Sequence, residues 1–448
     1  MIDVALTTRL ANNVSDALES EATRRTGNGL GALDHHGREA LATKVLSEEL
    51  QSVDAERLGQ GIGRLSAEDE NDLVDQVLAR VLGLGPIEMV LADPTVEEIV
   101  ASRWDRVFVY RASGHVQQLA EPFWSSENEM AHWLAHLART KGRTERQFNA
   151  QSPLLVMRLG DGLRLAAHRD VSQHIGFALR RNTLGKVTLD DLARLDMMHP
   201  VIVEMFRAIV RSKEIRLVFA GATSSGKSTT ARACLAELDP FAHVVVIEDT
   251  AELDLFDELA HPNVESWEKR EPNAEGEGEV SQGALVTHAL RARPDWLVCG
   301  EVRDSDAAVP MVKAMTLGQA SLTTVHAASA SGALDKLALY LGTGGDRLGM
   351  EVAHHQLSLA VDFVVHLAQL PSGQRVVTEI VQVAGFDGQR CSVNGIYRYD
   401  DQFGAQGFAR LGEAITLKLR KVGFDPASLA TIGTDHIHRA NVQMGTRR

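Results

Sequence analysis

The stretch Gly221-Ala-Thr-Ser-Ser-Gly226-Lys227-Ser228 decides the fold that we expect for this chain. It fits the pattern G-x-x-x-x-G-K-[S/T] at every fixed position. The apolar run 215–220 before it predicts a strand, and residues 229–238 after it have the composition of a helix. Strand, glycine-rich loop and helix is the arrangement in which this motif turns backbone N–H groups toward phosphates. The sequence therefore predicts an α/β fold with a nucleotide-binding loop.

Each fixed position of the loop has an expected role. The glycines at 221 and 226 let the backbone amides turn inward, and the N-terminus of the following helix adds a positive dipole. Lys227 can reach the β and γ phosphates, and the hydroxyl of Ser228 can hold Mg²⁺. ATP and Mg²⁺ are the ligands expected here. The remaining loop residues expected at the nucleotide are Thr223, Ser224, Ser225 and Thr229.

Polar residues follow three further apolar runs that predict strands. Residues 244–247 end in Glu248, residues 296–300 end in Glu301, and residues 321–325 end in His326. In open α/β sheets, ligands bind at the carboxyl ends of the strands. We expect Glu248 and Glu301 to orient the attacking water or to hold Mg²⁺, partly through water, and His326 to sense the γ-phosphate. Either glutamate could be the general base. Glu301 is preferred because it immediately follows the strand expected at 296–300.

Composition excludes several classes of protein. The chain has 448 residues, which at ~150 residues per domain suggests roughly three units. Its 46 Lys and Arg against 60 Asp and Glu give a net charge of −14, which argues against direct contact with DNA. Three cysteines are too few for a disulfide framework, so a reducing, cytosolic compartment is expected. No run of ~18 apolar residues occurs, so no transmembrane segment is expected.

The pattern of residues changes along the chain. Residues 1–65 predict a variable extension, partly disordered or helical. A capping-box pattern at Ser66 opens a smaller α+β domain that is expected over 66–192. Residues 193–200 are the expected linker. Strand–helix alternation over 201–448 predicts a parallel α/β core with a C-terminal extension.

Taken together, these motifs resemble the ATPases of bacterial type II and type IV secretion systems. The branch that the chain resembles most is the CpaF type, which drives tight-adherence (Tad/Flp) pilus assembly. The resemblance covers about residues 70–400 and includes two long specific stretches, 270–278 and 289–295. The motifs that carry it are GATSSGKSTT as the Walker A motif, VVVIEDTAEL as the aspartate box, LVCGEVRD as an atypical Walker B motif and TTVHAAS as the histidine box. One departure is residues 317–321, Leu-Gly-Gln-Ala-Ser, where the family has Gly-His-x-Gly-Ser.

The resemblance implies a RecA-like P-loop NTPase domain at the C-terminus and a smaller N-terminal domain. Members of this family form hexameric rings that bind nucleotide between the two domains of each chain. Arginine suits such a site because its guanidinium group pairs bidentately with phosphate oxygens. The arginines expected at the phosphates are Arg158, Arg164, Arg180 and Arg181 from the N-terminal domain, and Arg291 and Arg293 from the second specific stretch.

The function that the resemblance implies is Mg²⁺-dependent ATP hydrolysis that moves one domain against the other and powers pilus assembly or protein secretion. The expected location is cytoplasmic, at the inner face of the cell membrane, through an inner-membrane platform protein. Two alternatives stay open. One is a conjugation-type motor that moves DNA or effector proteins. The other is a nucleotide-binding scaffold in which the altered histidine box weakens turnover.

Overall fold

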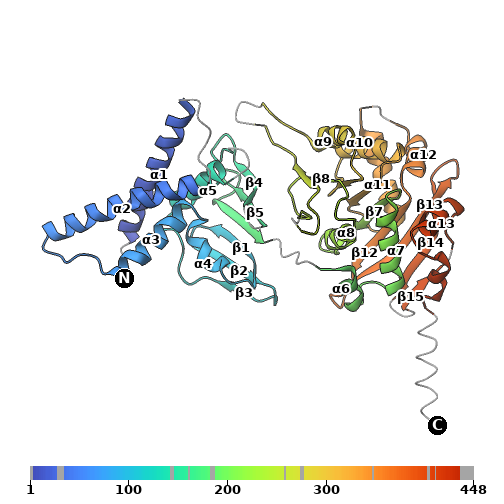
Figure 1. The fold of residues 1–448 in the computed structure, drawn as a ribbon, viewed down its shortest axis with the longest axis horizontal. Helices are drawn as coiled ribbons and strands as arrows, with labels where there is room; N and C mark the ends of the chain where they lie inside the picture. Colours follow the sequence, from blue (N-terminus) through green and yellow to red (C-terminus); the bar gives the residue numbers. More distant parts are fainter. Residues whose placement is uncertain are drawn as a thin grey trace, which may run out of the picture. The chain divides into compact units, whose positions relative to one another are not determined.

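The computed structural model describes residues 4–27, 35–141, 146–159, 162–181, 187–256, 259–272, 277–345, 348–400, 404–408 and 410–433. Contacts divide the chain into two compact units, Met1–Asn182 and Thr183–Arg448, both drawn in Figure 1. The division precedes the linker expected at 193–200. Those residues instead hold the end of α6 (Leu189–Arg194) and the start of α7 (Pro200–Ser212).

The first unit begins with three helices, α1 (Val4–Gly27), α2 (His35–Gly59) and α3 (Ala67–Val81). The side chain of Ser66 accepts a hydrogen bond from the Asp69 N–H, as the capping pattern predicted. All three helices contribute to one small core, which includes Leu10, Leu46 and Leu73. The helices therefore pack together across residue 65, where the sequence suggested a boundary.

The rest of the first unit is an antiparallel sheet in the order β3-β2-β1-β6-β5-β4. One sheet face packs against α5 (Glu127–Thr140) around Ile99, Leu134 and Leu165, and the short η1 (Gly85–Ile87) and α4 (Glu88–Leu91) complete that core. The strands are β1 (Val96–Arg103), β2 (Arg106–Arg111), β3 (Val116–Gln118), β4 (Leu154–Leu159), β5 (Leu163–His168) and β6 (Gly176–Arg181). This arrangement is the small α+β domain that the sequence predicted.

The second unit is built on a sheet in the order β15-β14-β13-β12-β7-β11-β10-β8-β9. The strands from β12 to β9 in that order run parallel, and the other three are antiparallel. The strands are β7 (Arg216–Gly221), β8 (Val244–Glu248), β9 (Val264–Glu268), β10 (Trp296–Cys299), β11 (Ser321–Val325), β12 (Phe363–Gln369), β13 (Arg375–Phe386), β14 (Cys391–Asp400) and β15 (Gly404–Gly407). Because β11 and β10 lie between β7 and β8, the predicted RecA-like fold is confirmed.

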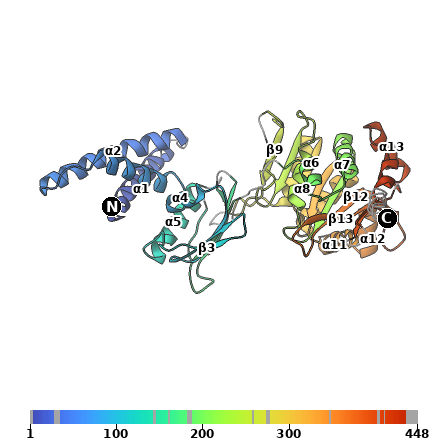
Figure 2. The same ribbon diagram turned by 90° about the horizontal axis from the view of Figure 1, so that it is seen from below.

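Helices cover both faces of this sheet, as Figure 2 shows for α7 on one side and α11 and α12 on the other. Side chains of β7 alternate between the two cores: Leu217 and Phe219 point to one, Val218 and Ala220 to the other. This alternation explains why the strand is apolar throughout. The other helices are α8 (Lys227–Leu235), α9 (Gln282–Ala292), α10 (Ser305–Thr316), α11 (Ala330–Thr343), α12 (Met350–Ala360), α13 (Glu413–Lys421) and η2 (Pro426–Thr431).

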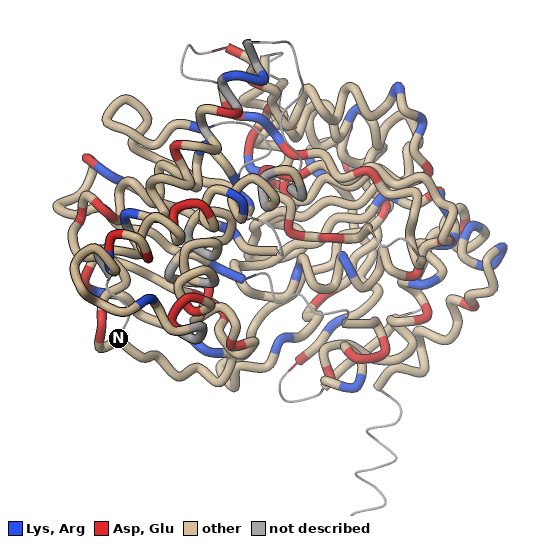
Figure 3. Tube along the Cα trace, turned by 60° about the vertical axis from the view of Figure 1, so that its left-hand side comes forward, with Lys and Arg blue, Asp and Glu red and all other residues tan. Residues whose placement is uncertain are grey.

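Two features bear on the charge and the apolar content of the chain: the spread of its charged residues and the character of its helices. Basic and acidic segments are interspersed along the trace on the face that Figure 3 shows. Within the described ranges, none of the helices combines the length and the apolar character that crossing a membrane requires.

Candidate functional site

The phosphate loop joins the carboxyl end of β7 to the start of α8. Its backbone has positive φ at Gly221 (153°), Ser224 (62°) and Gly226 (97°). A Cβ atom at residue 221 would lie 2.3 Å from the Leu367 carbonyl oxygen, and one at residue 226 would lie 2.8 Å from the Met197 methyl group. Glycine is therefore required at residue 221 by a close backbone neighbour as well as by backbone conformation, and at residue 226 by backbone conformation.

Lys227 lies at the first position of α8 with only 7% of its surface exposed. Its Nζ donates hydrogen bonds to the carbonyl oxygens of Gly221 (2.9 Å) and Ala222 (2.7 Å). Burial lowers the pKa of the lysine, and the negative charge of Glu301 acts in the opposite direction. The ammonium group is thus held inside the loop, facing the Glu301 carboxylate.

Glu301 follows β10 and lies beside His326, which follows β11. The Nε2 atom of His326 is 2.9 Å from Glu301 Oε1, close but without hydrogen-bond geometry, and Arg303 Nη2 donates to Glu301 Oε2 over 2.8 Å. Burial and the charge of Lys227 lower the pKa of His326, while Glu301 acts to raise it. The ring is therefore neutral near pH 7. The structure thus brings Lys227, Glu301 and His326 together, as the sequence predicted for the ends of these strands.

Glu248, at the end of β8, is held differently. It is 5% exposed, and its carboxylate accepts hydrogen bonds from the N–H groups of Glu252 and Leu253. Burial raises the pKa of Glu248 to about 7, although these two hydrogen bonds act to lower it. A Cβ atom on residue 300 would lie 2.6 Å from Glu248 Cγ, so Gly300 is required for the side chain to fit. Glu248 thus closes the turn after its own strand.

Two buried oxygens near the loop have capacity for a ligand. Ser225 Oγ and Glu301 Oε1 are both buried and accept or donate no hydrogen bond within the described part of the chain. A buried polar atom without a partner costs about 1–3 kcal/mol, so such atoms mark places where a ligand, ion or water binds. Hydroxyl and carboxylate oxygens such as these are the ligands that Mg²⁺ prefers. The residues present therefore fit a magnesium nucleotide.

Arg291 and Arg293 lie at the other end of the parallel strands, where the strands begin. This end is called the amino edge of the sheet, and the end that carries the phosphate loop is called its carboxyl edge. They belong to the end of α9 and to its C-cap, and Arg293 has φ 55°. The chain then enters β10 at its amino end, where the Asp295 N–H donates to His243 O before β8. Because β10 runs parallel to β7 through β11, this edge is opposite the phosphate loop. Within one chain these two arginines are therefore not brought to the site where the sequence expected them.

The altered part of the histidine box lies at this same amino edge, before β11. The Gln319 amide group donates to the carbonyl oxygen of Pro294 over 2.9 Å, which ties the turn after Arg293 to the start of β11. In this chain, residues 317–320 thus support the connection between two strands and are separated from the phosphate loop by the length of β11.

Three of the four arginines expected from the first unit form a row. Arg158, Arg164 and Arg180 are directly opposite one another on β4, β5 and β6, and Glu98 on β1 continues the row. Cross-strand partners share a sheet face, so the three guanidinium groups lie on the face opposite the core. Arg181 points the other way, and its guanidinium group donates to the carbonyl oxygens of Leu91 and Asp93. Arg181 therefore anchors a loop.

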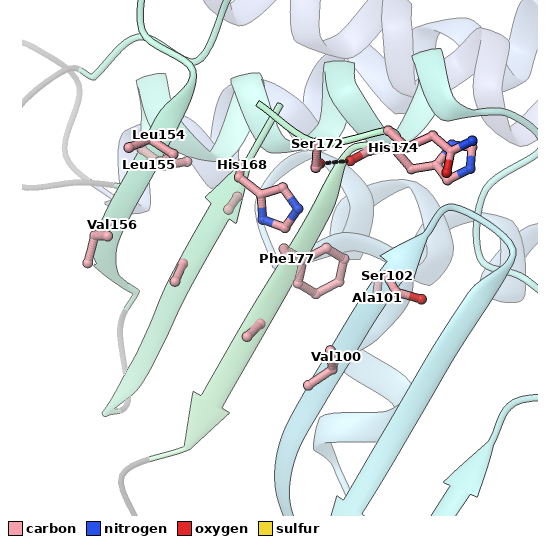
Figure 4. A pocket seen from close by; sticks show the side chains of 14 residues that line it. Val100, Ala101, Ser102, Leu154, Leu155, Val156, His168, Ser172, His174 and Phe177 are labelled. Atoms are coloured by element: carbon pink, nitrogen blue, oxygen red, sulfur yellow. Dashed lines mark hydrogen bonds between the residues drawn. The ribbon is translucent and has the colours of Figure 1, made fainter. Parts of the chain in front are cut away.

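A hollow of about 600 Å³ lies on the same open face of the first unit's sheet (Figure 4). Its lining is mainly apolar and includes Val100, Leu154, Val156 and Phe177, with His168 at its edge. Leu154 and Val156 are 66% and 41% exposed. The arginine row thus borders an apolar surface.

The sequence reasoning missed Arg375, at the start of β13. Its Nε donates to the carbonyl oxygen of Ser224 over 2.8 Å, and its Cδ would be 3.5 Å from a Cβ atom on residue 226. No local motif marks this residue, because it lies far downstream of the loop that it contacts. The strand pairing of β12 with both β7 and β13 is what brings it there.

Comparisons with known proteins agree with this geometry. The family described as Type II/IV secretion system protein matches residues 81–398. The conjugal transfer protein TrbB of Rhizobium radiobacter is 27% identical over 308 residues, covering 66% of this chain and 87% of the relative. The type IV secretion system protein VirB11 of Brucella suis is 26% identical over 313 residues, covering 63% of this chain and 84% of the relative.

Among solved structures, the Legionella pneumophila ATPase DotB aligns with a TM-score of 0.49 and 18% identity, covering 66% of this chain and 79% of that one. The family match spans more than half of the chain and contains every strand that carries a residue of the phosphate-loop site. It also contains the row of arginines in the first unit. The chain therefore belongs to the type II/IV secretion system protein family.

Proposed function

We propose that this chain is a Mg²⁺-dependent ATPase that powers a secretion or pilus machine. The observation that carries the proposal is the convergence of Lys227, Glu301 and His326 at the carboxyl ends of three neighbouring parallel strands, β7, β10 and β11. A cation that holds phosphate and a carboxylate that orients water are groups that phosphoryl transfer to water uses, and His326 adds a ring nitrogen beside them.

In this site the loop amides and Lys227 hold the phosphates, with Ser225 Oγ available to donate to a phosphate oxygen. Ser228 and Glu301 would hold Mg²⁺, which neutralises phosphate charge when it is bound. Glu301 orients the attacking water and accepts its proton, since its Oε1 has no hydrogen-bond donor in the described chain. His326, whose Nε2 lies beside Glu301, is placed to donate a hydrogen bond to the γ-phosphate.

Glu248 is the second candidate for the base. A pKa of about 7 suits general-base chemistry near neutral pH. Both of its oxygens, however, lie within reach of backbone N–H groups of the turn that follows β8. We therefore assign Glu248 to positioning that turn and Glu301 to the water.

The arginines extend the proposal to an assembly. We propose a homo-hexamer, in which Arg158, Arg164 and Arg180 approach the nucleotide as one row. Arg291 and Arg293 can reach a phosphate only from another copy, because they lie at the amino edge of their own sheet. A site shared between copies would link turnover to assembly.

For the cellular role we propose assembly of a tight-adherence pilus, through an inner-membrane platform protein. The long stretches that resemble the CpaF type support this role. The name of the TrbB relative supports the second candidate, a conjugation-type motor. The two predict different neighbours for the gene: pilin genes for the first, and genes for a conjugation channel for the second.

The experiment is ATP hydrolysis by the full chain with Mg²⁺, over a range of protein concentrations. Lys227→Ala is run in parallel, with Lys313→Ala, on the exposed side of α10, as the matched control. Turnover that rises with concentration and vanishes only in the Lys227 variant supports a motor. Nucleotide binding with no more turnover than in Lys227→Ala would instead show a nucleotide-binding scaffold.

A further inference from the structure

The hairpin of β12 and β13 contacts both halves of the nucleotide site. β12 pairs in parallel with β7, so that Leu367 lies opposite Gly221 at the start of the phosphate loop. β13 returns antiparallel to β12 and carries its own residues back past the same region. One rigid element therefore lies next to the loop from β7 and to the turn from β11.

On the loop side, the contact is Arg375. Its Nε–H donates to the carbonyl oxygen of Ser224, the non-glycine residue of the loop that has left-handed backbone conformation. Such a conformation is costly for serine and persists only when its surroundings hold it. A charged donor on the Ser224 carbonyl stabilises that conformation and thereby the direction of the amides that follow.

On the other side, the contacts are His366 and Glu379, which are cross-strand partners in the hairpin. Glu379 Oε2 accepts the N–H of Ala330, the first residue of α11, over 3.1 Å. His366 Nδ1 lies 2.6 Å from Thr378 Oγ1, and its ring lies close enough to the backbone of Ala327 for that backbone to raise the pKa of the ring, against the lowering by burial. Both contacts fall within the short turn that follows His326.

A bulge in the hairpin makes the His366 contact possible. His366 pairs with Glu379 and Leu367 pairs with Val377, so Thr378 is the extra residue between them. Bulges re-aim side chains and are frequent next to active sites. Here the bulge places the Thr378 hydroxyl against the imidazole and fixes the orientation of the ring.

We propose that the β12–β13 hairpin braces the phosphate loop against the turn that carries His326, with Arg375 as a positioning residue for the loop and His366 as a positioning residue for the turn. This inference rests on the proposed ATPase function. A change at Arg375 should affect the binding of any nucleotide, because the phosphate loop contacts both ADP and ATP. A change at His366 should affect hydrolysis alone, because His326 acts only on the transferred phosphate.

The test uses the full chain and two readouts: the dissociation constant of a fluorescent ADP, and the kcat for ATP. Arg375→Ala is expected to weaken ADP binding about tenfold, as expected for the loss of one charged hydrogen bond. His366→Ala is expected to leave ADP affinity within about twofold and to lower kcat about tenfold. His366→Gln, which keeps a polar side chain that can donate and accept hydrogen bonds, is expected to recover part of that kcat.

Two variants serve as controls. Arg390→Ala changes an exposed arginine in the turn between β13 and β14, and His355→Ala changes an exposed histidine of α12. Arg375→Lys keeps the charge and the stem of the side chain, so it separates loss of the Nε–H from loss of folding. ADP affinity in Arg375→Ala equal to the wild type, or a His366→Ala defect in ADP affinity that Gln does not recover, would overturn the brace.

The same data separate this inference from the proposed function. A wild type that binds ADP but hydrolyses no ATP refutes the ATPase, and the Arg375 variants then decide the brace by affinity alone. A wild type that binds no ADP refutes both. A wild type that hydrolyses ATP, with Arg375→Ala and His366→Ala unchanged, refutes the brace alone.

Discussion

The carboxyl edge and the amino edge of the second unit's sheet, the two ends of its parallel strands, differ in whether their polar groups have hydrogen-bond partners. At the carboxyl edge, Ser225 Oγ and Glu301 Oε1 are buried without hydrogen-bond partners in the described chain. At the amino edge, the Nε and Nη2 atoms of Arg216 donate to the two carboxylate oxygens of Asp362. The third guanidinium nitrogen, Nη1, donates to the carbonyl oxygens of Met315 and Leu359. The first edge leaves capacity for a ligand, whereas the second satisfies its own polar groups.

Residues that are close in the sequence can therefore lie at opposite ends of one strand. Arg293 belongs to the specific stretch 289–295 and Glu301 to the Walker B-like motif that follows it, and β10 separates them. The residue before a parallel strand lies at one edge and the residue after it at the other. We expect the amino edge to support folding and assembly and the carboxyl edge to support chemistry.

The largest effect is expected at the amino edge, for Asp362→Ala. Asp362 and Arg216 have side chains that are 9% and 15% exposed, so the change leaves a nearly buried, unpaired cation. Breaking such a pair costs about 3–5 kcal/mol. Urea unfolding of the wild type and the variant measures the loss. The matched control is Asp425→Ala, which removes a carboxylate that is 67% exposed. An equal loss of unfolding free energy in the two variants would show that the pair of Arg216 and Asp362 is no more stabilising than an exposed one.

The next effect is expected at the carboxyl edge, for Glu301→Gln. The amide cannot accept the proton of water, so kcat should fall about 100-fold, while ADP affinity stays close to that of the wild type. Steady-state hydrolysis and a binding titration measure the two quantities. Unchanged kcat would remove Glu301 from the chemistry and return the role to Glu248.

A smaller effect is expected for the pH dependence of stability at Glu248. Burial raises the pKa of Glu248 from 4.5 to about 7, so the folded state holds this proton more tightly than the unfolded state. The stability that it contributes is present below pH 4.5 and is lost as the pH rises through 7. Relative to Glu248→Gln, the wild type should lose on the order of 3 kcal/mol over that range. Urea unfolding at pH 4.5 and 7.5 measures it, and parallel pH profiles would contradict the burial of a titrating carboxyl group.

The smallest effect is expected for Arg291→Ala at the amino edge. At low protein concentration its ADP affinity should equal that of the wild type, because the side chain is far from its own phosphate loop. At high concentration its kcat should be about tenfold lower, since the arginine then acts on another copy. A defect in ADP binding by dilute protein would place Arg291 at the site of its own chain.

Part of the second unit could be predicted because four of its strands, β7, β8, β10 and β11, are short apolar runs followed by a distinctive residue or loop. The phosphate loop, Glu301 and His326 followed from that pattern. For residues 1–65 the sequence predicted an extension that is partly disordered or helical. It did not locate α1, although Leu10, Val14 and Leu18 recur at helical spacing, because polar residues surround them. The position of Arg291 and Arg293 could have been inferred from strand direction. The contact of Arg375 could not, since it depends on the pairing of β12 with β7.

The most direct measurement mixes two defective chains, the inactive Lys227→Ala and the weakened Arg291→Ala, and follows ATP hydrolysis. If the amino edge of one copy completes the carboxyl edge of another, some sites in a mixed ring contain both native residues, roughly a quarter of them for random mixing of equal amounts. The account predicts activity well above the sum of the two variants measured alone. Activity equal to that sum would contradict it, because each chain would then hold its complete site by itself.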